Sequence, residues 1–246
     1  MRTLFIVLLT VFFSFSFHIQ AQKMDMSKYL NDTNNIAAKG NYKEALKRHI
    51  WFHNNALKYA PSMSGVRLSF ALGYWKELGE KYPPAMKALK DIRNAKTKLV
   101  EDGKASFEIF HDVSAINRTL DEKDKTFQLF LMVDKKYPAK AKKYWIIVDN
   151  DFIDAKRYDI VRKYIKNISE RYDRLKMIYS ISSKNFDNPK MGPRYKKFCQ
   201  QSFVKNVTRL IKVAVALGKE KEAKEIKAKA LKVIDSEKLR KVPTSK

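Results

Sequence analysis

His49 and His53 are the residues of this 246-residue chain whose types and spacing most resemble a site of chemistry. They stand four positions apart in GNYKEALKRHIWFHNNAL, residues 40–57. Four residues make about one helical turn, so both imidazoles would point the same way and could bind one zinc ion. No glutamate stands between them, so the metalloprotease pattern is incomplete. Two alternatives stay open: a metal site, or two histidines packed between helices, which we favour.

Other polar residues could join such a site. His111 is followed by Asp112, and three histidines with an open position form a catalytic zinc arrangement. Arg67 lies in the apolar stretch GVRLSFAL and needs an anionic partner, such as Asp112 or a bound carboxylate, unless it faces solvent. The candidate groove or binding residues are His49, Trp51, His53, Arg67, Trp75, His111 and Asp112.

The signatures of common enzyme classes are missing from the sequence. There is no nucleophile elbow, phosphate loop, dinucleotide-binding glycine pattern or calcium loop. The single cysteine, Cys199, excludes an intrachain disulfide, and we expect it to pack in an amphipathic helix. We therefore expect no catalytic residue, no metal and no cofactor, and we expect the protein not to be an enzyme.

The charge balance is strongly basic. The chain has 51 Lys and Arg against 26 Asp and Glu, a formal net charge of +25. Residues 184–246 hold 18 basic and 6 acidic residues, a net charge of +12. Such a surface attracts an anionic polymer or an anionic membrane surface. The alternative is a solvated lysine coat without a specific ligand, since specific phosphate sites tend to use arginine.

The first 21 residues have the order of a secretory signal peptide. One arginine, Arg2, precedes an apolar run from Leu4 to Phe17, and the small residue Ala21 follows a short polar stretch. The apolar run is shorter than the roughly 20 residues that span a bilayer. We expect cleavage after Ala21, a secreted or periplasmic protein, and no integral membrane segment in the mature chain.

The rest of the chain has the pattern of an all-α protein. It has only seven glycines and seven prolines, and apolar residues recur at three- and four-residue spacing. Pro61, Pro83-Pro84, Pro138 and Pro193 mark helix boundaries. We expect a single helical domain over residues 22–246, with helices at 25–38, 42–58, 64–80, 83–100, 105–118, 122–136, 138–152, 155–166, 168–183, 194–217 and 219–235.

Internal echoes indicate helical hairpins. Lys-Tyr-Pro occurs at residues 81–83 and 136–138, and GNYKEAL at residues 40–46 is echoed by GKEKEA at 218–223 and, more weakly, by AKRY at 155–158. GNYKEAL and LGKEKEAKEIKAKAL, which has Ala223 and Ala230 seven apart, resemble the turn and second helix of a tetratricopeptide repeat. The first-helix pattern of that repeat is missing, and residues 40–85 also resemble secreted bacterial repeat proteins without a known activity.

The resemblance implies stacked antiparallel helical hairpins, a tetratricopeptide-like solenoid, whose groove binds a protein or peptide partner. It also places His49 where the repeat has a bulky apolar residue, which is why we favour packing. We therefore expect a non-enzymatic secreted binding protein. The alternatives are a polyanion-binding envelope protein that uses the basic C-terminal region, and a metal-dependent enzyme at the histidines.

Overall fold

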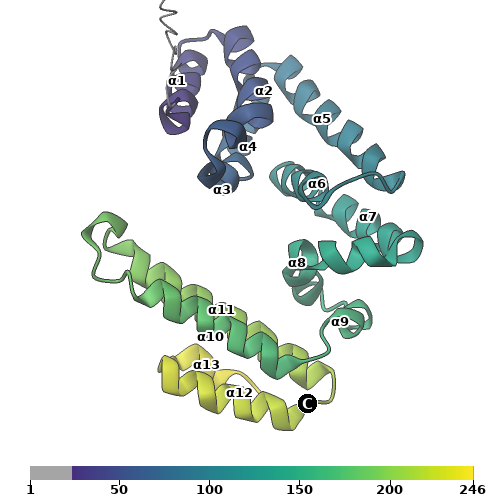
Figure 1. The fold of residues 1–246 in the computed structure, drawn as a ribbon, viewed down its shortest axis with the longest axis vertical. Coiled ribbons are helices and arrows are strands. Elements are labelled where there is room, and N and C mark those ends of the chain that lie inside the picture. The colour runs from purple at the N-terminus through teal and green to yellow at the C-terminus, as the bar shows by residue number, and fades with distance from the viewer. Residues whose placement is uncertain (1–23, 246) are drawn as a thin grey trace, which may run out of the picture. The chain divides into compact units, whose positions relative to one another are not determined.

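The computed structural model describes residues 24–245 (Figure 1). The chain is all-helical, with 81% helix and no strand among the described residues, which confirms the all-α part of the predicted fold class. The stacking of the hairpins into a tetratricopeptide-like solenoid stays a prediction. The described residues group into two compact units, and the boundary falls between Tyr82 and Pro83. The predicted single domain stays a prediction. The predicted signal peptide, with its cleavage site after Ala21, lies outside the described residues.

Unit 1 ends at Tyr82 and is built around the hairpin of its first two helices. Asp25 caps the first helix, because its carboxylate accepts hydrogen bonds from the backbone N–H groups of Ser27 and Lys28. The buried apolar residues on the facing sides of these helices include Met26, Leu30, Phe52 and Ala56. The helices of unit 1 are α1 (Met26–Ala38), α2 (Tyr42–Tyr59), the 3₁₀ turn η1 (Pro61–Met63), α3 (Ser64–Arg67) and α4 (Phe70–Lys81).

The prediction of one continuous helix at residues 64–80 is wrong, because the structure has two helices there, α3 and α4. At the break, the Ser69 hydroxyl donates a hydrogen bond of 2.7 Å to the carbonyl oxygen of Gly65, and the Ser69 N–H bonds to Val66 instead. A serine side chain that takes the carbonyl of a helix in this way competes with the backbone ladder. The break sets the direction of α4, on which Trp75 lies.

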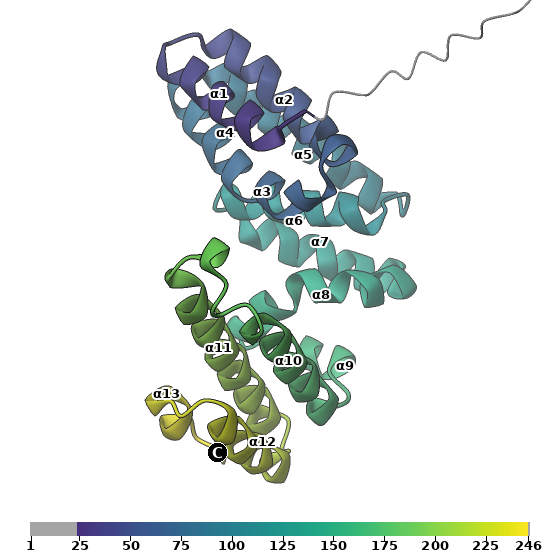
Figure 2. The same cartoon turned by 60° about the vertical axis from the view of Figure 1, so that its left-hand side comes forward.

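Unit 2 begins at Pro83 and contains the remaining helices. α10 and α11 run antiparallel side by side, and α12 packs along α11 (Figure 2). The predicted helices agree with those of the structure except that α9 is shorter and α13 was not expected. The helices are α5 (Pro83–Glu101), α6 (Phe107–Thr119), α7 (Lys123–Lys136), α8 (Pro138–Asp154), α9 (Tyr158–Tyr164), α10 (Ile168–Ser183), the 3₁₀ turn η2 (Pro189–Met191), α11 (Arg194–Ala216), α12 (Glu220–Val233) and α13 (Glu237–Lys241).

Aromatic rings form much of the core of unit 2. Phe110 of α6 stacks on Tyr144 of α8, with ring centroids 4.4 Å apart. Trp145 stacks on Tyr164 at 4.5 Å, and Phe130 of α7 packs against both. These rings tie α6, α7, α8 and α9 into one core, so the residues on the other face of α8 are held on a rigid support.

Five helices end with the same turn. In each, one residue has a positive φ, and the two N–H groups that follow the helix bond back to carbonyls of its last turn, as in the Schellman motif. Three of the turns use a glycine, which adopts this conformation without strain. The other two use Asp121 and Lys156. In these five turns, the residues with positive φ are Gly40, Gly103, Asp121, Lys156 and Gly218.

The weak sequence echo at residues 155–158 is therefore a real turn, but its register differs from the expected one. The echo predicts Ala155 as the turn residue, whereas Lys156 has the positive φ of 56°. Lys156 N–H bonds to the Ile153 carbonyl and Arg157 N–H to the Phe152 carbonyl, each at 3.0 Å. Lys156 thus occupies the position that is glycine in the copies at Gly40 and Gly218.

Candidate binding groove

The two histidines of α2 contact the same tryptophan. The ring of His49 lies parallel to Trp75 with centroids 5.9 Å apart, and the ring of His53 meets Trp75 edge-on at 6.1 Å. Both imidazoles therefore lie on one side of α2, as their spacing predicts. His49 is 2% exposed, and its Nε2 has no hydrogen-bond partner among the described residues. Burial lowers the pKa of His49 from 6.5 to about 4, so this ring is neutral at pH 7.

Arg67 lies beside His53. Its Nη1 donates to the His53 carbonyl oxygen at 3.1 Å and lies 3.2 Å from Nε2 of the same residue. Arg67 is only 6% exposed, so the alternative in which it faces solvent does not hold. Within the described part of the chain, no group of three or more His, Cys, Asp or Glu side chains could hold a metal ion.

The remaining predicted site residues lie elsewhere. Trp51 packs on Tyr29 of α1, with ring centroids 4.8 Å apart. His111 and Asp112 belong to α6 of unit 2, where His111 contacts the ring of Phe107 and Asp112 forms an ion pair with Lys96. The pairing of Arg67 with Asp112 and the binding role of all seven residues stay predictions.

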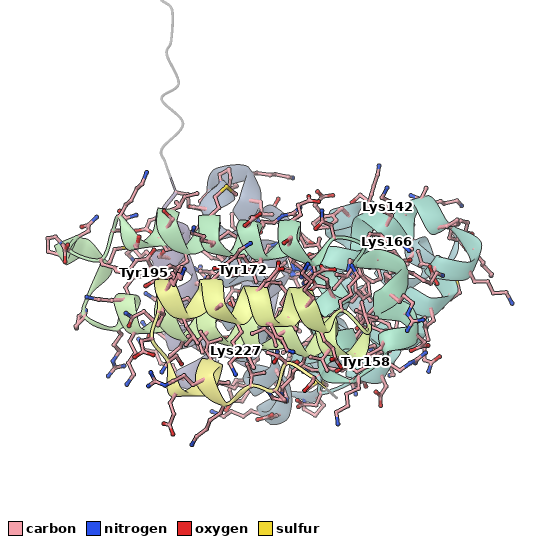
Figure 3. All side chains as sticks on the ribbon, turned by 90° about the horizontal axis from the view of Figure 1, so that it is seen from below. Lys142, Tyr158, Lys166, Tyr172, Tyr195 and Lys227 are labelled. Atoms are coloured by element: carbon pink, nitrogen blue, oxygen red, sulfur yellow. The ribbon has the colours of Figure 1, made fainter. Side chains whose placement is uncertain are left out.

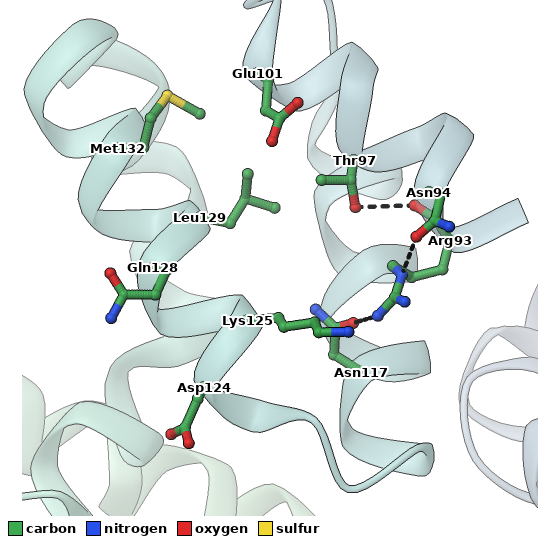
Figure 4. A pocket seen from close by; sticks show the side chains of 10 residues that line it. All are labelled: Arg93, Asn94, Thr97, Glu101, Asn117, Asp124, Lys125, Gln128, Leu129 and Met132. Atoms are coloured by element: carbon green, nitrogen blue, oxygen red, sulfur yellow. Dashed lines mark hydrogen bonds between the residues drawn. The ribbon is translucent and has the colours of Figure 1, made fainter. Parts of the chain in front are cut away.

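A cavity of about 620 Å³ lies between α5, α6 and α7 (Figure 4). Its wall contains the buried guanidinium of Arg93, whose Nη1 donates to Asn117 at 2.6 Å and to Glu122 at 2.5 Å. Hydrogen bonds from Lys125 and then Arg93 lower the pKa of Glu122 below its usual value. Asn117 in turn donates to Thr126 at 3.0 Å. This network joins the three helices, so we interpret Arg93 as a brace.

A groove of about 660 Å³ lies between α8, the start of α10 and α11. Two isoleucines on its walls are open to solvent: Ile146 of α8 is 61% exposed and Ile178 of α10 is 53% exposed. Isolated exposed isoleucines are common, but two that line one concave surface are typical of an interaction site. The groove, defined here as the α8–α10–α11 groove, is lined by Lys142, Lys143, Trp145, Ile146, Asp149, Asn150, Ile153, Tyr164, Ile165, Lys166, Asn167, Glu170, Arg171, Arg174, Leu175, Ile178, Asn206, Arg209 and Leu210.

Cations outnumber anions on this lining. Six lysines and arginines face two carboxylates, those of Asp149 and Glu170. Asp149 accepts a hydrogen bond from Arg171, and Glu170 pairs with Arg174. Among the remaining cations, three lysines form no ion pair within residues 24–245, namely Lys142, Lys143 and Lys166. Lys142 and Lys166 are labelled in Figure 3. The groove therefore favours an anionic ligand.

An aromatic wall holds the groove in shape. Tyr164 lies against Trp145 and donates its hydroxyl proton to Asp134. Burial, and then this hydrogen bond, raises the pKa of Tyr164 above its usual value, so the hydroxyl keeps its proton at pH 7. The indole N–H of Trp145 has no hydrogen-bond partner among the described residues. The groove wall thus has a rigid apolar surface.

Helix α10 carries the sequence signal that could have revealed this groove. Its apolar residues do not all lie in the buried stripe, since Met177, Ile178 and Ile181 are exposed while Ile168 and Tyr172 are buried. Apolar residues outside the buried stripe of a helix leave apolar surface open to a partner. The alternation of lysine and tyrosine in this region would suit stacking on bases or sugars, but it instead contributes core residues such as Tyr172.

Comparison with known proteins gives no relative for this chain: no protein-family model, curated protein or solved structure shows a significant match. The resemblance to tetratricopeptide repeats therefore stays a prediction. Within residues 24–245, no helix has both the length and the apolar character needed to cross a bilayer.

Proposed function

We propose that this chain is a secreted or periplasmic, non-enzymatic helical repeat protein that binds a short acidic segment of a partner protein in the α8–α10–α11 groove. The observation that carries the proposal is the combination of two exposed isoleucines, Ile146 and Ile178, with unpaired lysines on one concave surface. Burial of an isoleucine side chain contributes about 1.5–3 kcal/mol, which gives affinity, while the lysines select for acidic flanks.

The repeat part of the proposal rests on the hairpins. Helices α1 and α2 join through Gly40, α5 and α6 through Gly103, and α11 and α12 through Gly218. The small residues that the repeat pattern places between paired helices, Ala45 and Ala223, are fully buried. This is the packing that a stacked hairpin array requires, and such arrays present extended binding surfaces.

A peptide selection tests the groove. A display library of random peptides is selected on the chain from Gln22 onward. We expect enriched peptides to carry Asp or Glu next to large apolar residues. The double variant Ile146→Ser/Ile178→Ser should weaken binding of such a peptide by at least about tenfold, because both apolar contacts are lost. Fluorescence anisotropy with a labelled peptide measures the affinity.

The matched control is Met177→Ser/Ile181→Ser, which removes two residues of α10 that are similarly exposed but lie outside the groove lining. It should change the affinity by less than about twofold. Equal losses in both double variants, or selection of peptides without acidic residues, would contradict the proposed site.

The second candidate is a polyanion-binding envelope protein, favoured by the lysines of residues 184–246. If release of counterions drives such binding, the affinity for heparin must fall steeply as the salt concentration rises. A weak salt dependence would exclude this candidate. The proposed export has a separate test: the protein isolated from its native host should begin near Gln22, and an intact Met1 would refute the cleavage.

A further inference from the structure

A second cluster of lysines surrounds a smaller cavity, outside the proposed peptide groove. This cavity, of about 350 Å³, lies where the turn between α8 and α9 meets α11 and α13, and we name it the basic pocket. Its lining includes Lys156, Tyr158, Lys205, Thr208, Lys212 and Lys238. Tyr158 is labelled in Figure 3. The pocket draws on three segments that are distant in the sequence, so no linear motif would have revealed it.

The α11 wall of the basic pocket follows one helical face. Lys205, Thr208 and Lys212 are separated by three and four residues, so their side chains project on the same side. Arg209 and Asp154 also line the cavity, but they neutralise each other through a bidentate contact in which Arg209 Nε donates to Asp154 at 2.7 Å. The net charge of the lining therefore comes from the lysines.

Four ammonium groups in the basic pocket lack an anionic partner. No ion pair of Lys156, Lys205, Lys212 or Lys238 occurs within the described residues 24–245, although many other lysines of the chain are paired. Like charges gathered around one cavity repel each other, and an anion placed among them removes that repulsion. The lining thus favours an anion of more than one charge.

Thr208 provides a second, independent observation. It is 7% exposed, and its hydroxyl has no hydrogen-bond partner among the described residues. Threonine in a helix ordinarily bonds to a carbonyl one turn back, so a buried hydroxyl that makes no bond is unusual and unfavourable. An oxygen of a ligand in the basic pocket would supply the missing partner.

Lys156 provides a third observation. It has a φ of 56° at the turn position where Gly40, Gly103 and Gly218 occur in the corresponding turns. A lysine is strained in this conformation, and a glycine would not be. Strained residues concentrate at functional sites, where the side chain is needed in spite of the backbone cost. Here the side chain lines the basic pocket.

We propose that the basic pocket binds a phosphate group, carried by a small soluble phosphate ester or by the headgroup of a phospholipid. Lys156, Lys205, Lys212 and Lys238 supply the positive charge, and the Thr208 hydroxyl and Tyr158 supply hydrogen bonds. Ammonium groups form strong charge-assisted hydrogen bonds with phosphate oxygens. The site is distinct from the peptide groove, although Arg209 and Ile153 line both.

Titration calorimetry with inorganic pyrophosphate at low ionic strength tests the site. We expect one saturable site on the chain from Gln22 onward. Lys205→Glu/Lys212→Glu should weaken binding by at least about tenfold, because two charge-assisted contacts become repulsive. The control Lys221→Glu/Lys224→Glu makes the same charge change on the exposed face of α12, outside the pocket, and should weaken binding by less than about twofold.

Two milder variants separate binding from folding. Thr208→Val keeps the shape of the side chain but removes the hydroxyl, so it should weaken pyrophosphate binding by about threefold or more while the melting temperature stays the same or rises. Lys156→Gly should raise the melting temperature and also weaken binding. Equal affinity losses in the two double variants, unchanged affinity in both of these variants, or the absence of saturable binding would overturn the proposal.

Vesicles identify the source of the phosphate. Binding to phosphatidylcholine vesicles that contain phosphatidic acid, displaced by pyrophosphate and lost in Lys205→Glu/Lys212→Glu, would assign the site to a lipid headgroup. Binding to pyrophosphate without binding to these vesicles would assign it to a soluble ester. Ile146→Ser/Ile178→Ser should leave pyrophosphate binding unchanged, so failure of the peptide groove and failure of this site are distinguishable.

Discussion

The histidine cluster of unit 1 and the groove of unit 2 differ in how they place residues that could bind a ligand. The histidines are buried, whereas the groove residues are open to solvent. His49 and His53 lie one turn apart on α2, and both rings are buried against Trp75. Ile146 and Ile178 are ordinary in sequence and are 32 positions apart, yet they line one open groove. Short-range spacing on a helix therefore predicted only that the two rings share one face, whereas the candidate binding surface depends on contacts between distant helices.

The difference has a physical cause. Residues at i and i+4 share one face of a helix, and in a helical protein one face of most helices must be buried to supply the hydrophobic free energy of folding. Two imidazole rings on that face can therefore pack in the core as long as they stay neutral. A binding groove must instead keep apolar and charged groups open to water, so its residues fall outside the buried stripe. Substitutions in the two regions test this division.

The first prediction has the greatest magnitude and compares how much a substitution in each region lowers the free energy of unfolding. Trp75 is 1% exposed and contacts both histidines, so Trp75→Ala should reduce the free energy of unfolding by about 3–5 kcal/mol. Ile146 is 61% exposed, so Ile146→Ser should change it by less than about 0.5 kcal/mol. Urea unfolding followed by circular dichroism measures both. Similar losses in the two variants would remove the distinction between core cluster and open groove.

Much of the fold was predictable because helix boundaries are local. Pro83 and Pro138 begin α5 and α8, and Gly40, Gly103 and Gly218 end helices, as local sequence signals indicate. The break at Ser69 was not predictable, since it depends on a side-chain bond to Gly65. The candidate groove escaped prediction for a different reason. Sequence periodicity shows which face of α8 or α10 is apolar, but not which helices face each other across a cavity.

The second prediction concerns the pH dependence of stability and tests the interpretation of His49 as a buried neutral ring. Because burial lowers its pKa from 6.5 to about 4, the unfolded chain binds a proton at His49 that the folded chain does not. Stability from this residue is fully present above pH 6.5 and is lost as the pH falls toward 4, by about 3 kcal/mol in all. His49→Phe, which has no ring nitrogen to protonate, should lose this pH dependence and keep the fold.

The free energy of unfolding is measured for the native chain and for His49→Phe, and the difference between the two proteins is compared at pH 7 and at about pH 4.5. The lower pH lies between the unfolded and the folded pKa of His49, 6.5 and about 4. Other acidic groups titrate alike in both proteins and cancel. A constant difference would show that His49 is not a buried neutral ring. If a chelator lowers the melting temperature of the native chain and not of His49→Phe, the metal alternative is correct instead.

The third prediction concerns the turn between α5 and α6, which holds the helices of the Arg93 brace. Gly103 has a φ of +69°, and a β-carbon there would lie 2.7 Å from the Tyr137 ring. Gly103→Ala should therefore lower the free energy of unfolding by about 1–2 kcal/mol through backbone strain, and by more if the ring cannot move. Gly40→Ala is the control, since it has the same backbone strain with open space around the β-carbon. Equal losses of unfolding free energy in the two variants would show that the Tyr137 ring moves aside without an energetic penalty.

The smallest expected effect is the most informative about unit 2. Lys156 occupies the glycine position of its turn, so Lys156→Gly should raise the free energy of unfolding by about 0.5–1 kcal/mol, because the strain is relieved. In the histidine cluster, the buried side chains stabilise the fold by packing. At Lys156, by contrast, a residue that destabilises its turn lines a pocket of unpaired cations. A gain in stability together with a loss of pyrophosphate affinity would establish that the lysine is there for a ligand. A loss of stability would show that the Lys156 side chain stabilises the turn by contacts of its own, and the argument from strain would then fail.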